Sequence, residues 1–349
     1  MIKIGDKIVG TTSPIFIIAE AGSNHNGSIE MAYQLIDAAT QAGVDAIKFQ
    51  TFKAEHIYPR TGAKVEYLKE LGLNEPLYDI IKKAEMPKHW LPLLSLYCKK
   101  KGIIFLSTPF DEASANALNP YVDAFKIASY EITHLPLIRH IARKQKPIIL
   151  STGTATIEEV KKAVEAIRAE KNEDIIVMQC TAKYPAPNES LNLNAIKTLR
   201  KELNLMTGLS DHSENPVVAP IAATALGAVI IEKHFTLDHK LPGADHKFAL
   251  EPVGLKLMVQ AVREEEKALG TGIKKPHKVE EELCNYKRAV FSLTDIKAGE
   301  AITKINTRIL RKPGIPDEGI SPENYDLIIG KLASCDIPQF TLIKKEMIP

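Results

Sequence analysis

Cysteine is scarce in this chain, and the few that occur show no spacing typical of a structural site. The 349 residues include four cysteines, and no two of them form a C-x-x-C pair. This excludes a disulfide-rich scaffold and argues against a cysteine-ligated zinc ion. We therefore expect the four thiols to be free and buried.

The chain also lacks an excess of charge, a long apolar run and an apolar stretch of the signal-peptide kind in its first residues. Lys and Arg total 45 and Asp and Glu total 43, for a net charge of +2, which gives no sign of nucleic-acid or membrane-surface binding. The longest uncharged run, Asn215–Ile231, has 17 residues and two prolines, whereas a membrane span needs about 20. The first ten residues contain no apolar signal-peptide core. We expect a cytoplasmic protein without a membrane or nucleic-acid partner.

Eight short apolar runs are instead the main structural signal. Each has strand length and is rich in Ile, Val, Leu or Phe, as expected of parallel strands covered on both faces. The runs are Ile15–Gly22, Ala46–Phe52, Ile103–Pro109, Ala124–Tyr130, Pro147–Gly153, Ile175–Thr181, Leu205–Ser213 and Val229–Leu237.

Helical patterns lie between these runs. Ser28 and Gly43 can begin and end a helix over Ser28–Ala42, and Thr156 with Glu159 fits a capping box. Further helices are expected at Thr156–Glu170, Ser190–Glu202, Pro216–Gly227 and Glu251–Leu269. Eight strand–helix units predict an α/β fold of the TIM (β/α)8 barrel type. A doubly wound open sheet would call for a G-x-G-x-x-G turn after its first strand, and none is present.

Two segments lie outside the eight units. Ile2–Val9 alternates around Gly5 and Asp6, which predicts a hairpin that caps one end of the barrel. After residue 269 the composition changes to a Gly-rich, charged stretch. We predict a barrel domain over residues 1–269, a linker over 270–286 and a small, mostly β domain over 287–349.

Polar side chains collect at the predicted carboxyl ends of the strands, where barrel active sites lie. All eight strands end in charged or hydrogen-bonding groups, and burying so many without partners would be costly, at about 1–3 kcal/mol each. A bound polar ligand is the simpler account. The candidates are Glu20, Lys48, Gln50, Thr108, Lys126, Ser129, Glu131, Ser151, Tyr184, Ser210, His212 and His234.

Lys48 and Lys126 are expected on strands two and four, and alternate strands contribute to the same layer of a barrel. Two ammonium groups at close range repel each other unless an anion lies between them. With the hydroxyl groups nearby, they suit a small molecule that carries a carboxylate and a phosphate. The alternative is two separate ion pairs, with Glu20 and with Glu131.

His212 and His234 are expected on adjacent strands at matching heights. Two imidazoles can hold a divalent metal ion and leave positions open for oxygen ligands. The alternative is a pair of hydrogen-bonded structural histidines.

Seven segments of the sequence resemble the sialic acid synthases, a family that makes nonulosonic acids from phosphoenolpyruvate. The segments are Ile17–Gly27, Lys48–Gln50, Phe105–Phe110, Phe125–Ser129, Ile149–Gly153, Gly208–His212 and Ile231–Phe235. In the tail, Lys297–Glu300 and Gly330–Ala333 resemble the family's antifreeze-like (SAF) domain. Ala128–Glu131, Ala182–Pro187, Ser213–Pro216 and Leu241–His246 resemble the spore-coat polysaccharide synthase branch most.

The resemblance implies a role for each candidate. Phosphoenolpyruvate would contact Lys48, Thr108, Lys126, Ser129, Ser151 and Ser210. The sugar would contact Glu20, Gln50, Glu131, Tyr184, Asp245 and, from the tail, Arg311 or Lys312. His212 and His234 would bind Mn²⁺ or Mg²⁺. Glu20, Lys126 and Asp245 would be catalytic.

The implied activity is that of a transferase, which condenses phosphoenolpyruvate with an open-chain N-acetylhexosamine such as N-acetylmannosamine and releases phosphate after water addition. Alternatives are a legionaminic or pseudaminic acid synthase acting on a di-acetamido sugar, a metal-dependent pyruvate aldolase, a Schiff-base aldolase using Lys126 or Lys48, and a sugar-binding module. The family also implies a domain-swapped homodimer.

Two positions depart from the family pattern. Ala182 replaces an Asn that contacts phosphate, and Lys312 replaces an Arg that contacts the N-acetyl group, with Arg311 beside it. These differences concern the phosphate and N-acetyl contacts and hence the exact sugar.

Overall fold

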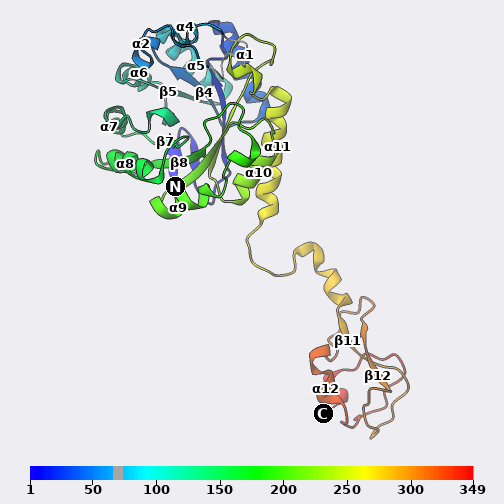
Figure 1. Ribbon diagram of the computed structural model, residues 1–349. Helices are drawn as coiled ribbons and strands as arrows, with labels where there is room; N and C mark the ends of the chain where they lie inside the picture. The colour runs from blue at the N-terminus through cyan, green and yellow to red at the C-terminus, as the bar shows by residue number, and fades with distance from the viewer. Residues whose placement is uncertain (66–73, 349) are drawn as a thin grey trace. The chain divides into compact units, whose positions relative to one another are not determined.

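The computed structural model describes residues 1–65 and 74–348, and these form two compact units, Met1–Gly270 and Thr271–Pro349 (Figure 1). The first unit contains an eight-stranded parallel sheet surrounded by helices, and the second contains a two-stranded antiparallel sheet with short helices.

The parallel sheet curls into a barrel. Its strands follow the order β5-β4-β3-β10-β9-β8-β7-β6, and β5 and β6, at the two ends of that order, lie beside each other. The eight strands are β3 (Phe16–Gly22), β4 (Ala46–Thr51), β5 (Ile104–Pro109), β6 (Phe125–Ile127), β7 (Ile148–Ser151), β8 (Ile175–Cys180), β9 (Met206–Asp211) and β10 (Ile230–His234). Each coincides with one of the eight apolar runs, so the predicted (β/α)8 barrel is confirmed.

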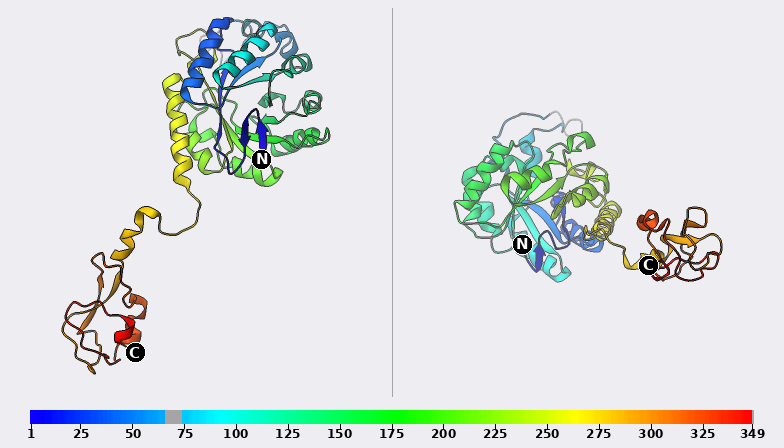
Figure 2. Two further views of the ribbon diagram at one scale, coloured as in Figure 1. Left: turned by 180° about the vertical axis from the view of Figure 1, so that it is seen from behind. Right: turned by 90° about the horizontal axis from the view of Figure 1, so that it is seen from below.

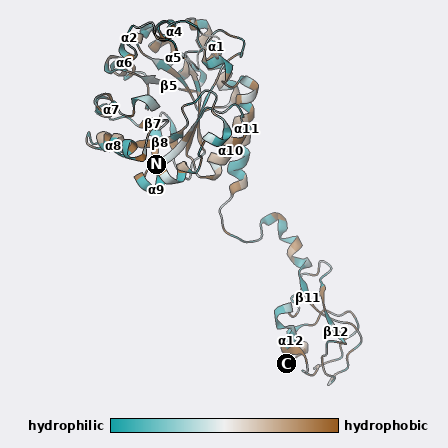
Figure 3. Ribbon diagram, viewed as in Figure 1, coloured by the Kyte–Doolittle hydropathy of each residue, from teal (hydrophilic) through white to brown (hydrophobic). Residues whose placement is uncertain are grey.

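Helices form a ring around these strands, as the view turned by 90° shows (Figure 2). Most of these helices bury an apolar face in the core around the strands. Hydrophilic and hydrophobic residues both occur along α11 (Figure 3). The helices are α1 (Ile29–Ala42), α2 (Ala54–Ile57), α4 (Leu77–Lys83), α5 (Leu91–Lys101), α6 (Glu112–Leu118), α7 (Leu135–Ala142), α8 (Ile157–Arg168), α9 (Ala195–Leu203), α10 (Val218–Ala225) and α11 (Pro252–Leu269).

The predicted helix ends are present. Ser28 accepts a hydrogen bond from the Met31 N–H, and Gly43 ends α1 in the left-handed conformation, with φ of 84°. Thr156 and Glu159 form the predicted reciprocal capping box at the start of α8.

Two predicted boundaries were too generous. The strand predicted to reach Tyr130 ends at Ile127, and Ser129–Glu131 form a 3-10 turn. The helix predicted from Ser190 begins at Ala195, because the carbonyl groups of Ser190 and Leu191 accept hydrogen bonds from Thr181 and Gln179. These bonds attach the segment to the end of β8 instead of to a helical turn.

The N-terminal hairpin closes the barrel at the amino ends of the strands. It consists of β1 (Ile2–Ile4) and β2 (Lys7–Val9), joined at Gly5, as predicted. Ile2, Ile4 and Val9 pack into the apolar cluster that includes Phe16 and Ile104 at the strand starts. This leaves the opposite end of the barrel for polar side chains.

The second unit has its own small apolar core around Val290, Ile302 and Ile337. Its sheet pairs β11 (Arg288–Ser292) with β12 (Thr307–Arg311), followed by α12 (Tyr325–Ile328). Residues 271–286 contain the short 3-10 turns Lys278–Glu280 and Glu282–Tyr286.

The cysteine prediction holds only in part. All four thiols are free, but Cys335 is exposed and Cys284 is half-buried, because both lie in the small second unit or the segment before it. Cys98 and Cys180 are buried in the barrel. Among the described helices, none combines the length and the apolar character that crossing a membrane requires.

One glycine in the barrel allows a close approach of two strands. A Cβ atom on Gly208 of β9 would lie 2.2 Å from Ile230 Cγ2 and 2.5 Å from the Ile230 carbonyl oxygen of β10. We predict that Gly208→Ala lowers the free energy of unfolding by about 1–3 kcal/mol, because the strands must separate. In the control Gly254→Ala, in helix α11, the new methyl group would meet nothing closer than 3.5 Å. That variant should match or exceed wild-type stability in urea unfolding, and equal stability of the two variants would contradict the prediction.

Candidate active site

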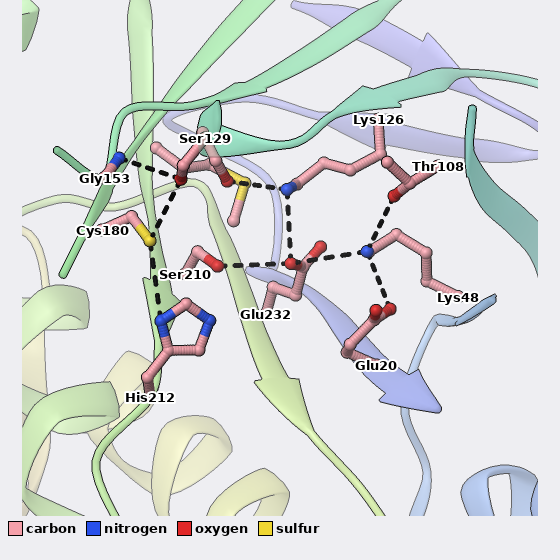
Figure 4. Close-up of polar contacts among 12 residues, drawn as sticks. Glu20, Lys48, Thr108, Lys126, Ser129, Gly153, Cys180, Ser210, His212 and Glu232 are labelled. Atoms are coloured by element: carbon pink, nitrogen blue, oxygen red, sulfur yellow. Dashed lines mark hydrogen bonds and ion pairs between the residues drawn. The ribbon is translucent and has the colours of Figure 1, made fainter. Parts of the chain in front are cut away.

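A cavity of about 530 Å³ opens at the carboxyl ends of the strands. Its floor consists of buried charged and hydroxyl groups, many of which contact one another (Figure 4). Of the barrel residues predicted from sequence, all but Glu131 line it: Glu20, Lys48, Gln50, Thr108, Lys126, Ser129, Ser151, Tyr184, Ser210, His212, His234 and Asp245.

Lys48 of β4 has two polar neighbours on adjacent strands, Glu20 of β3 and Thr108 of β5. Its Nζ atom lies 2.7 Å from Glu20 Oε2 and 3.0 Å from Thr108 Oγ1, to which it donates. Glu20 Oε1 accepts a second hydrogen bond from Gln50 Nε2 at 2.9 Å. Burial would lower the pKa of Lys48, but the carboxylates of Glu20 and Glu232 outweigh it and raise that pKa. Lys48 therefore stays positively charged.

Lys126 of β6 is buried on the other side of the floor. It donates to Ser151 Oγ at 2.7 Å and lies 3.4 Å from Glu232 Oε1. Burial, the largest influence, lowers the pKa of Lys126. An anion entering the cavity would offset this loss of hydration.

Glu232 lies between the two lysines and is the residue that sequence reasoning missed. Its Oε1 atom is 3.7 Å from Lys48 Nζ and 3.4 Å from Lys126 Nζ, and it accepts a hydrogen bond from Ser210 at 3.2 Å (Figure 4). Its Oε2 atom is buried without a hydrogen-bond partner. The alternative of two independent pairs is therefore half right, since Glu20 pairs with Lys48 but Lys126 pairs with Glu232 and not with Glu131.

A clue to Glu232 was present in the sequence. Glu232 and His234 are two residues apart on one strand and therefore share a face, whereas Lys233 points the other way. Lys233 is buried outside the cavity, where it lies 2.6 Å from Asp211 Oδ2. Because His234 was a candidate site residue, Glu232 on the same face of the strand should have been one too.

Hydroxyl and thiol groups line the side of the cavity nearest β7 and β8. The Gly153 N–H donates to Ser129 Oγ at 2.9 Å, and Ser129 donates to Cys180 Sγ at 3.5 Å. Cys180 was expected only as a buried thiol, but it lines the cavity. Ala182 packs here too, since a Cβ atom on Gly153 would lie 2.9 Å from the Ala182 Cβ. This corner is therefore tightly filled by small side chains.

His212 and His234 lie together, as predicted, with ring centroids 5.1 Å apart. His212 Nδ1 is 2.8 Å from the Thr181 carbonyl oxygen, so this atom carries the proton and Nε2 can bind a metal ion. His234 Nδ1 is buried without a hydrogen-bond partner, and burial holds the pKa of His234 well below its usual range. Against the effect of burial, Cys180 and the Thr181 carbonyl raise the pKa of His212, so a bound cation would have to displace any proton on its Nε2 atom. Each ring nevertheless offers one nitrogen that could bind a divalent cation.

In the described parts of the chain, no carboxylate joins the two histidines as a third metal ligand. No cluster of three or more His, Cys, Asp or Glu side chains with ligand spacing occurs there. Asp245 Oδ2 is 3.8 Å from His234 Nδ1, beyond hydrogen-bond distance. The two imidazoles lie close together, and their predicted role as metal ligands stays a prediction.

Two carboxyl groups near the histidines titrate close to neutral pH. Burial raises the pKa of Glu20 to about 7, against the opposing effect of Lys48, and burial raises the pKa of Asp245 to about 6. Groups with such pKa values can both accept and release protons under physiological conditions.

The remaining amino acids that were predicted to contact the sugar lie in three different parts of the structure. Tyr184 stacks on His212, with ring centroids 4.3 Å apart. Glu131 does not line the cavity; the residue is half-buried, and its Oε2 atom is buried without a hydrogen-bond partner. Arg311 and Lys312 belong to the second unit, where Arg311 ends β12 and Lys312 donates to the Asp317 carbonyl oxygen at 3.2 Å. Their predicted contact with the sugar stays a prediction.

Comparison with known proteins agrees with this geometry. The NeuB family matches residues 35–274 and the SAF domain matches residues 287–349. The chain is 45% identical to the spore coat polysaccharide biosynthesis protein SpsE of Bacillus subtilis, over 97% of this chain and 95% of that protein. It is 40% identical to the N,N′-diacetyllegionaminic acid synthase of Campylobacter jejuni, over 94% of this chain and 98% of that protein.

A solved structure is similar as well. The N-acetylneuraminic acid synthetase of Leptospira borgpetersenii, crystallised with citrate, matches with a TM-score of 0.72 and 36% identity, over 82% of this chain and 95% of that chain. The protein described here therefore belongs to the NeuB family and carries a SAF domain, which confirms the family predicted from sequence.

The buried Glu131 carboxyl group should make stability depend on pH. Burial raises its pKa from 4.5 to about 7. The folded state therefore binds this proton more tightly than the unfolded state, and stability falls as pH rises from about 4.5 to about 7. We predict that Glu131→Gln raises the melting temperature by about 2–4 °C at pH 8 and hardly changes it at pH 4.5.

Differential scanning calorimetry at both pH values measures this effect. Glu165→Gln, at an exposed position of α8, is the matched control and should change little at either pH. An equal gain at both pH values would show that the effect comes from packing and not from the charge.

Proposed function

We propose that this protein is a nonulosonic acid synthase, which condenses phosphoenolpyruvate with the open-chain form of an N-acetylated hexosamine and releases phosphate. The observation that carries the proposal is the pair of buried lysines at one cavity floor, flanked by hydroxyl donors. Relatives that include a legionaminic acid synthase and a sialic acid synthetase support the assignment to the nonulosonic acid synthases.

Phosphoenolpyruvate carries two anionic groups, and the cavity floor offers two cationic ones. Lys48 with Thr108 would hold the carboxylate, and Lys126 with Ser151 would contact the phosphate. Ser129 and Ser210 would add hydrogen bonds at the phosphate. Held in this way, the methylene carbon of the substrate faces the open side of the cavity, where the acceptor sugar would bind.

His212 and His234 would hold a Mn²⁺ or Mg²⁺ ion beside this anion subsite. When bound, such an ion would supply Lewis-acid polarisation of the aldehyde oxygen. Tyr184 and Phe248 pack against the His234 ring, with centroid distances of 5.7 and 5.1 Å, and so hold its orientation. Their aromatic surfaces also exclude water from this side of the cavity.

Proton transfer would fall to Glu20 or Asp245. Both carboxyl groups line the cavity and have pKa values near neutrality. Glu20 is held in place by Lys48 and Gln50, whereas Asp245 lies in a loop after β10. Either can accept the proton of the water molecule that adds to the former enol carbon before phosphate leaves.

The acceptor is an N-acetylhexosamine such as N-acetylmannosamine. A specific observation favours a second candidate, a di-acetamido sugar: two relatives named N,N′-diacetyllegionaminic acid synthase are 40% and 37% identical over most of this chain. We further propose a cytoplasmic homodimer in which Arg311 or Lys312 of one protomer reaches the sugar in the other.

Product analysis tests the reaction. We expect mass spectrometry to detect a nine-carbon acid and free phosphate when the protein is given phosphoenolpyruvate, Mn²⁺ or Mg²⁺ and a matching hexosamine from a panel.

Removal of the metal is a second test. A chelator should abolish formation of the product, and addition of the metal should restore it. Full activity of metal-free protein in excess chelator would overturn the metal assignment. A covalent adduct trapped by borohydride would indicate a Schiff-base aldolase instead.

The lysines provide a separate test of the anion subsite. We predict that Lys48→Met and Lys126→Met each weaken phosphoenolpyruvate binding roughly 30- to 5,000-fold, because each removes a buried charge-assisted contact worth about 2–5 kcal/mol. Isothermal titration calorimetry measures the affinity directly. Lys161→Met, which removes an exposed lysine on α8, should bind as wild type does. Unchanged affinity in both buried-lysine variants would refute the subsite.

A further inference from the structure

His246 is a fully buried histidine whose two ring nitrogens contact two different loops. Its Nδ1 atom lies 2.6 Å from Thr236 Oγ1, just after β10. Its Nε2 atom lies 3.2 Å from Asn26 Oδ1, in the loop between β3 and α1. Because an amide oxygen only accepts, Nε2 carries the proton and Nδ1 accepts from the threonine. Both nitrogens of the neutral ring are thus satisfied.

The surrounding backbone fits closely around this ring. Gly243 has φ of 137°, and a Cβ atom there would lie 2.8 Å from His246 Cδ2. Asn26 is itself in the left-handed region, with φ of 48°. Two uncommon backbone conformations therefore occur at the two places where the loops meet the imidazole.

The residue before His246 faces the opposite way. Asp245 lines the cavity, and together Asp245–Lys247 form one 3-10 turn. This turn is too short to be stable by itself. Contacts with the surrounding chain must therefore hold the turn in place. The buried His246 ring provides two of them, the side-chain hydrogen bonds to Thr236 and Asn26.

We propose that His246 is a positioning residue for the synthase reaction: by bridging Thr236 and Asn26 it holds the turn that places Asp245 at the acceptor end of the cavity. The proposal rests on the proposed function and adds a part that neither the sequence nor the relatives assign. His246 itself is fully buried and is not among the residues that line the cavity.

A purely structural histidine would have different consequences. Loss of a core contact lowers global stability and affects both substrates alike. Loss of a positioning contact misplaces one group, which can cost about a hundredfold in rate for a displacement of about 1 Å. Asp245 Oδ2 lies 3.8 Å from His234 Nδ1, beside the proposed metal and acceptor site, so the loss should fall on the acceptor sugar.

The test compares His246→Ala with two amide variants. The side chain of Gln can reach the position of Nε2 and keep the Asn26 contact, whereas the shorter Asn reproduces only Nδ1. We expect His246→Ala and His246→Asn to lower kcat/KM for the sugar about 10- to 100-fold, with the Kd for phosphoenolpyruvate changed less than about threefold. His246→Gln should recover most of the activity. In a double-mutant cycle, Asn26→Ala should add little to His246→Ala.

The control is another histidine–asparagine pair in the same barrel. His140 Nε2 lies 2.8 Å from Asn116 Oδ1 on the outer helices, and His140→Ala should leave both substrates unaffected. Hydrogen–deuterium exchange of residues 238–249 provides a readout that needs no activity. Exchange there should accelerate in His246→Ala and Asn26→Ala but not in His140→Ala.

Each outcome decides one point. An equal loss for both substrates, additive effects of the two alanine variants, or unchanged exchange in the loop would overturn the positioning role. A wild-type protein that forms no nonulosonic acid would overturn the proposed function, and the exchange experiment would still report whether His246 holds the loop.

Discussion

The buried charge cluster of Lys48, Glu232 and Lys126 is the constraint on which the rest of the site depends. Two ammonium groups at the floor of a barrel repel each other and are poorly hydrated, so they need anions at close range. Glu232 provides one negative charge between them, and Glu20 pairs with Lys48. Among the described residues, Lys126 has no carboxylate of its own and shares Glu232 with Lys48, so it can still attract a further anion, such as one group of a doubly anionic substrate.

The barrel makes this cluster possible. Its strands are held by parallel hydrogen-bond ladders and by helices on the outside, while the N-terminal hairpin fills the opposite end with Ile2, Ile4 and Val9. The apolar layers beneath and around the floor therefore provide the stability against which buried charge is tolerated. Chemistry and folding occupy opposite ends of the same strands, which is the usual division in this fold.

Around the fixed floor, the walls come from loops. Ser129 is held by the Gly153 N–H, His212 by the Thr181 carbonyl, and the turn at Asp245 by its buried neighbour His246. Each of these contacts joins a cavity residue to a neighbouring loop, so the loops orient side chains that the strands alone would leave free. The strands therefore fix the charged groups of the floor, while the shape of the walls depends on contacts between loops.

The sequence by itself determined the number and order of the strands, because eight apolar runs of strand length have few other ways to be buried. It also determined which residues gather at the strand ends, since parallel strands bring their carboxyl ends together. It did not determine the pairing of the charges. The two-residue spacing from His234 places Glu232 on the cavity face and Lys233 on the other, but only the closed structure shows that Glu232 lies between two lysines and that Lys233 pairs with Asp211. The same holds for the place of Cys180 at the cavity and for the contact of His246 with Asn26, 220 residues away in the chain. Both follow from three-dimensional packing between segments that no local pattern connects.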